Sequence, residues 1–90
     1  MEKPNVENPE LASMLDKLYR PNARVGSGST SDALRHERLT GEQVGGRNHM
    51  QKVSDSIKGL ERWLEINKNI KATDISAAEN VLKDLRNALQ

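Results

Sequence analysis

Apolar residues recur every three or four positions in three stretches of the chain, which is the spacing of an amphipathic α-helix, and a fourth, shorter stretch holds an adjacent apolar pair. Segments rich in polar or turn-forming residues separate the four stretches. The apolar sets are Leu11, Met14, Leu15 and Leu18; Ala33 and Leu34; Met50, Val53, Ile57, Leu60 and Leu64; and Ile75, Ala78, Leu82, Leu85 and Leu89. The pattern therefore predicts four helices whose apolar faces meet in one core.

Residues that favour helix ends bound the first two stretches. Asn8 is predicted to cap the first helix, and Pro21 stops it. Thr30 or Ser31 is predicted to cap a short second helix, which Gly41 ends. The segment between the two helices is rich in Gly and Ser, so we expect a turn there.

The two C-terminal stretches are the longest, and they predict helices over residues 47–66 and 73–89. Thr73 is the expected cap of the last helix. Because the two helices have similar lengths and a short connection, we expect them to form an antiparallel hairpin. Gly59 costs about 1 kcal/mol in a helix relative to Ala, so we expect it to mark a close helix crossing.

The composition supports an all-α fold. The 90 residues include one Trp, one Tyr and no Phe, and strands favour aromatic and β-branched residues, which are scarce here. The length fits one domain. The sequence therefore predicts a small helical domain of about four helices with the C-terminal hairpin. Residues 1–20 are expected to form a linker and a short helix, and residues 21–90 the helical domain.

Charge and cysteine content exclude several classes of function. The net charge is +1, so the whole-chain charge does not predict nucleic-acid binding, and only local clustering of basic residues can. The absence of Cys excludes disulfides, thiol catalysis and Cys-based zinc sites. We expect no signal peptide at the start and no membrane span, because no apolar run approaches about 18 residues.

Both histidines of the chain lie between residues 35 and 52, among basic residues. His36 falls on the short second helix and His49 opens the third. Two imidazoles and a cation are suited to RNA cleavage, because one imidazole accepts the proton of the 2′-hydroxyl and the other protonates the leaving oxygen. Lys52 is the candidate cation. The alternative is a polar helix–loop–helix corner without chemistry.

Two Gly-containing turns precede helix starts, where free backbone N–H groups favour an anion. The first could equally be an ordinary turn capped from Ser29 to Asp32. The first turn is not a P-loop, because it has no Gly-Lys-Ser/Thr ending, and it follows no predicted strand, so it is not a dinucleotide fingerprint. The residues predicted to bind the substrate, chiefly through its phosphates, are Arg24, Ser29, Thr30, Arg35, Glu37, Gly45, Gly46 and Arg47.

Two other interpretations of these residues are weaker. His36, Glu37 and His49 could hold a divalent metal, but the His-Glu-x-x-His spacing is absent, so no metal site is predicted. Trp63, together with Lys58 and Arg62, could stack a base. It follows Leu60 by three residues, so a place in the core is the better interpretation.

The stretch "RVGSGSTSDALRHERLTGEQVGGRNHMQK", followed by "LERWLE" and "AAENVLKDLRNAL", resembles a C-terminal module of bacterial polymorphic toxins. Such modules are the tips of contact-dependent inhibition proteins and filamentous-haemagglutinin-like exoproteins. The resemblance covers about residues 20–90. One departure from it is length, because the chain is short for a nuclease domain. The matching residues are Gly26, Ser29, Thr30, Arg35, His36, Glu37, Gly41, Gly45, Gly46, His49 and Lys52. The resemblance implies delivery into a neighbouring cell, often as a nuclease, and a cognate immunity protein that blocks the module.

Three hypotheses follow. The first is a metal-independent ribonuclease toxin that cleaves tRNA or other cellular RNA with His36, His49 and Lys52 and uses no cofactor. The second is a non-catalytic helical module that binds a protein, and the third binds nucleic acid without cleaving it. The expected location is the tip of a secreted exoprotein that acts in the cytoplasm of the target cell, or the cytoplasm for an orphan module.

Overall fold

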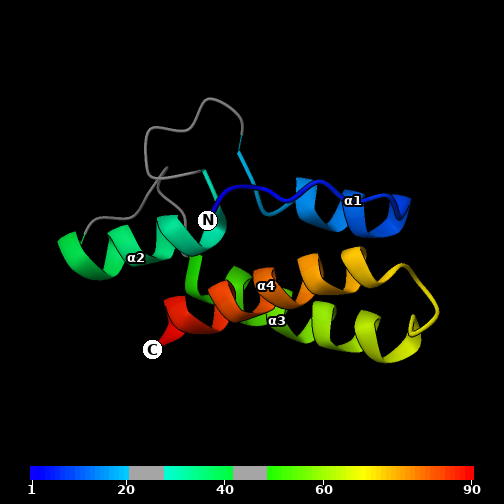
Figure 1. Cartoon of the computed structure of the whole chain (residues 1–90). Helices are drawn as coiled ribbons and strands as arrows, with labels where there is room; N and C mark the ends of the chain where they lie inside the picture. Colours follow the sequence, from blue (N-terminus) through cyan, green and yellow to red (C-terminus); the bar gives the residue numbers. More distant parts are fainter. Residues whose placement is uncertain (21–27, 42–48) are drawn as a thin grey trace.

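The computed structural model describes residues 1–20, 28–41 and 49–90, and in these ranges the chain forms four α-helices and no strand (Figure 1). The helices are α1 (Pro9–Asp16), α2 (Thr30–Thr40), α3 (His49–Ile66) and α4 (Ala72–Leu89). The predicted all-α fold is confirmed. None of these helices has the length and apolarity needed to cross a membrane, as judged over the described ranges.

Helices α3 and α4 run antiparallel and pack along their length, as the hairpin prediction required (Figure 1). Leu60, Leu82 and Leu85 are buried between the helices, and Leu64 packs at the edge of the core. Trp63 is also part of this core and is only 8% exposed, so the core interpretation of this residue is confirmed. The buried core residues are Leu11, Leu15, Leu18, Leu34, Val53, Leu60, Trp63, Ala78, Val81, Leu82, Leu85 and Ala88.

Three details of the hairpin differ from the sequence prediction. Met50 is half exposed, because its neighbour His49 takes the buried position in the first turn of α3. Thr73 does not cap α4, which begins at Ala72 after Lys71, whose carbonyl accepts the first helical hydrogen bonds. A methyl group at Gly59 would meet no atom within 4 Å, so this glycine does not mark a close helix crossing.

The caps of the shorter helices follow the sequence closely. The Asn8 side chain accepts hydrogen bonds from the backbone of Glu10 (2.9 Å) and Leu11 (3.1 Å), as an N-cap does. Ser29 caps α2 through the backbone N–H of Asp32, which confirms the alternative of an ordinary capped turn, whereas the predicted cap at Thr30 or Ser31 is wrong. Gly41 ends α2 in the left-handed conformation, with φ of 78°, which glycine adopts without strain.

Residues 1–20 pack on the same core as the rest of the described chain. Leu11 and Leu15 of α1 are fully buried in it. Glu7 and Asn8 lie just before α1. Their backbone N–H groups donate hydrogen bonds to the buried carboxylate of Asp74 in α4, at 3.0 Å and 2.8 Å. These contacts fasten the N-terminal segment to the first turn of α4.

Helix α1 ends at Asp16, five residues before the predicted stop at Pro21. The chain then extends and pairs with the segment that enters α2. The backbone N–H of Arg20 donates to the carbonyl of Gly28 (2.8 Å), and that of Thr30 donates to Leu18 (2.8 Å). This pairing fixes where α2 starts relative to α1.

Candidate functional site

The side chains of Glu37 and His49 meet between the last turns of α2 and the first turn of α3. His49 Nδ1 lies 2.5 Å from Glu37 Oε1, and each side chain is only 11% exposed. An ionised carboxylate can only accept, so a neutral imidazole in this contact donates its Nδ1 proton to Glu37. The Nε2 atom is then the ring nitrogen that carries the lone pair and can accept a proton from another molecule.

The apolar pattern of each helix explains why these two residues meet. Glu37 follows Ala33 by four residues and Leu34 by three, so it continues the buried face of α2. His49 precedes the fully buried Val53 by four residues and continues the buried face of α3 in the same way. The predicted site residues Glu37 and His49 are therefore brought together.

His36 is half-buried, and the described residues include no hydrogen bond to its ring. Successive helical residues point about 100° apart, so His36 leaves α2 in a different direction from Glu37. Glu37, rather than His36, is the α2 side chain that reaches His49. A cleft shared by both imidazoles stays a prediction.

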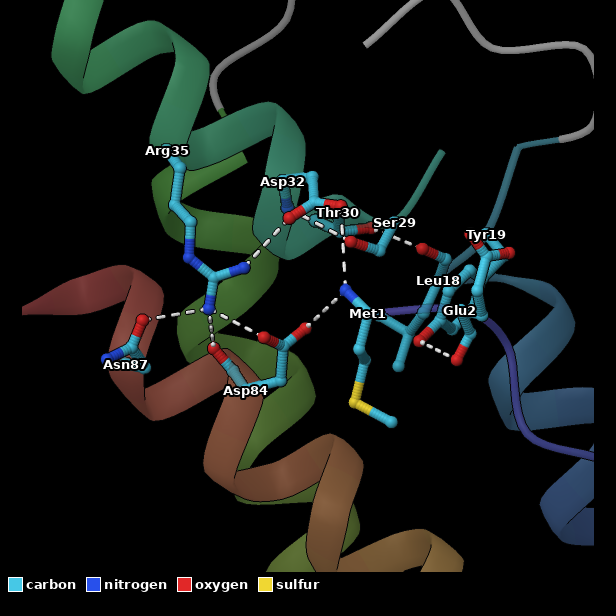
Figure 2. A network of polar contacts seen from close by, with 10 residues as sticks. All are labelled: Met1, Glu2, Leu18, Tyr19, Ser29, Thr30, Asp32, Arg35, Asp84 and Asn87. Atoms are coloured by element: carbon cyan, nitrogen blue, oxygen red, sulfur yellow. Dashed lines mark hydrogen bonds and ion pairs between the residues drawn. The ribbon is translucent and has the colours of Figure 1, made fainter. Parts of the chain in front are cut away.

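Arg35, predicted to bind phosphate, joins α2 to α4 (Figure 2). Its Nη2 donates to Oδ1 (2.6 Å) and the carbonyl (3.0 Å) of Asp84 and to Oδ1 of Asn87 (2.9 Å), while its Nη1 donates to Asp32 (2.9 Å). Partial burial lowers the pKa of Arg35, but hydrogen bonds and charges of Asp84 and then Asp32 outweigh it and raise the pKa. The guanidinium is thus a permanent cation whose charge these carboxylates balance.

Ser29 and Thr30 also make contacts within the chain (Figure 2). Ser29 Oγ accepts from the backbone N–H of Asp32 (3.0 Å), and Thr30 Oγ1 donates to the carbonyl of Leu18 (3.0 Å). The α-amino nitrogen of Met1 lies 3.5 Å from the Asp32 carboxylate. An anion at the start of α2 would meet this carboxylate, which opposes the predicted phosphate contacts there.

The remaining predicted residues divide into two groups. Lys52 is exposed and lies one turn after His49, so the two residues share a side of α3. Arg24, Gly45, Gly46 and Arg47 lie outside the described residues. No group of three or more metal-binding side chains is present within the described ranges.

Tyr19, the only tyrosine of the chain, borders the Asp32–Asp84 network (Figure 2). Its hydroxyl donates to the carbonyl of Glu2 at 3.3 Å. Burial, followed by the negative charges of Asp84, Asp32 and Glu2, raises the pKa of Tyr19 from 10.0 to about 12.

We expect the phenol of Tyr19 to ionise near pH 12 in the folded chain and near pH 10 after unfolding. Since the folded pKa is the higher one, the stability from this residue is complete below pH 10 and falls between pH 10 and about 12. Near-ultraviolet absorbance of the phenolate measures both titrations, with and without denaturant. A midpoint near 10 in a chain that keeps its helical circular dichroism would disprove the raised pKa.

Comparison with known proteins found no matching family model, no matching curated protein and no matching solved structure.

Proposed function

We propose that the chain is a metal-independent ribonuclease in which His49 is the general base and Glu37 orients it. The observation that carries this proposal is the 2.5 Å contact between His49 Nδ1 and Glu37 Oε1, with both side chains largely withdrawn from water. A carboxylate on Nδ1 selects the tautomer that is basic at Nε2 and stabilises the imidazolium formed after proton transfer. In this proposal Glu37, which the sequence predicts to bind the substrate, instead orients His49.

In the proposed reaction, His49 Nε2 accepts the proton of a ribose 2′-hydroxyl. The 2′-oxygen attacks the adjacent phosphorus, and the bond from phosphorus to the 5′-oxygen breaks, which leaves a 2′,3′-cyclic phosphate. The 5′-oxygen takes a proton from an acid, for which His36 is the sequence-based candidate. Lys52, which shares a side of α3 with His49, is the proposed cation that offsets the charge developing on the phosphate oxygens.

The resemblance to polymorphic-toxin modules supports a biological setting for this activity. We propose that the module acts on tRNA or other cellular RNA in the cytoplasm of a target cell, and that a cognate immunity protein neutralises it. No cofactor takes part in the proposed reaction.

A non-catalytic helical module that binds protein or nucleic acid is the second candidate. One observation favours the protein-binding form: the Arg35 guanidinium, predicted to bind phosphate, contacts Asp32, Asp84 and Asn87 within the chain. In such a module the Glu37–His49 contact would only fasten α2 to α3.

Incubation of total RNA with the purified protein, with and without EDTA, separates the two candidates. The ribonuclease proposal predicts cleavage at the same rate in both samples, since no metal takes part. Intact RNA in both samples would favour the non-catalytic module, and cleavage abolished by EDTA would contradict a metal-independent reaction. Co-expression of the chain with a neighbouring open reading frame would test the immunity partner. The proposal predicts that the partner protects the host cells.

A further inference from the structure

The apolar contacts that hold α2 in place end before the helix reaches Glu37. Its buried residues are Thr30, Ser31, Ala33 and Leu34, all in the first half of the helix. Leu39, in the last turn, is 86% exposed. The direction in which Glu37 points therefore depends on polar contacts in the second half of α2.

Arg38 provides such a contact. Its Nη1 donates to the carbonyl of Ala88, 2.6 Å away, in the last turn of α4. The carbonyls of a last helical turn lack partners within their own helix, and a cation there is favoured by the helix dipole. Arg35 stands one turn earlier on α2 and holds Asp84 and Asn87 of the same end of α4.

We propose that Arg38, with Arg35, is a positioning residue that sets α2 against the end of α4 and so aims Glu37 at His49. The two arginines are three residues apart and hydrogen-bond to α4. The neighbouring residue Glu37 contacts His49 of α3. Arg38 is the better residue to change, because it is exposed and Arg35 balances two carboxylates. The kinetic consequence rests on the proposed ribonuclease function, whereas the effect on the contact itself does not.

The test compares Arg38→Gln and Arg38→Lys with Arg86→Gln as the matched control. Arg86 joins α4 to Glu61 of α3 (2.8 Å) and is exposed, so its removal takes away an interhelical arginine without touching α2. The first readout is the NMR signal of the Nδ1 proton of His49, which a short hydrogen bond to Glu37 shifts strongly downfield. His36 serves as the internal reference, since the chain has only two histidines.

We expect Arg38→Gln to move the His49 signal toward that of His36 and to lower kcat about 10- to 100-fold at unchanged KM. Arg38→Lys keeps a charged donor and should recover most of both effects. Arg86→Gln should leave both unchanged. A folded Arg38→Gln variant with the wild-type His49 signal would overturn the inference, even if its melting temperature fell. If the wild type does not cleave RNA, the proposed function fails, and the NMR signal still tests the role of Arg38.

Discussion

Replacing His49 with Ala is expected to lower the rate of RNA cleavage by about 10²- to 10⁴-fold, as the loss of a proton-transfer group typically does. Glu37 contacts the imidazole of this residue at Nδ1, and Ala has no group that could accept the proton of a 2′-hydroxyl. The measurement is the initial rate of cleavage of an oligoribonucleotide at neutral pH in EDTA.

Two further variants make this result specific. Glu37→Gln should reduce the rate less than His49→Ala, since Gln can still accept a hydrogen bond from Nδ1 but cannot balance the imidazolium charge. His36→Ala tests the predicted acid and should also lower the rate if His36 protonates the 5′-oxygen. Circular dichroism must show that each variant is folded. A folded His49→Ala variant with the wild-type rate would remove His49 from the mechanism.

Truncating Leu82 to Ala is expected to lower the free energy of unfolding by about 2–5 kcal/mol, the usual cost of truncating a buried leucine to alanine. Leu82 is 6% exposed and lies in the core between the hairpin helices. In a chain of 90 residues such a loss is a large share of the total stability. Urea unfolding followed by circular dichroism measures it.

Leu39→Ala is the matched control, because the same side chain is removed from a site that is 86% exposed. It should change the stability by less than about 0.5 kcal/mol. Equal losses for Leu82→Ala and Leu39→Ala would show that the buried face of α4 has been misassigned.

The long helices are predictable because many of their residues follow the same three-and-four spacing of apolar positions. Over the 18 residues of α4, the expected positions Ala78, Leu82 and Leu85 are buried. Two of the three errors in the hairpin fall at helix ends, where one turn of sequence carries little periodic signal. Met50, expected on the buried face, is half exposed, and Thr73, expected as the cap, is not the cap.

The candidate site is predictable as a region but not as a set of contacts. Residues 35–52 hold both histidines, and composition alone draws attention to them. Whether His36 or Glu37 faces His49 depends on the rotation of α2. The signal that could have identified Glu37 is its place three and four residues after the buried Leu34 and Ala33.

The roles of the arginines depend on contacts that are distant in sequence. Arg35 meets a residue 49 positions away, and Arg38 meets one 50 positions away. No local pattern reports such pairings, because they are fixed by how α2 packs against α4. A cluster of basic residues therefore looks the same in sequence whether it binds phosphate or fastens helices.

Cleavage of two matched oligonucleotides decides whether His49 acts on a ribose hydroxyl. One oligonucleotide is all-ribose, and the other carries a single 2′-deoxy residue at the position where the first is cut. In EDTA, we expect the protein to cleave the first and leave a 2′,3′-cyclic phosphate, and to leave the second intact at that position. An uncut ribose oligonucleotide, or equal cleavage of both, would show that the chain does not catalyse attack by the 2′-oxygen.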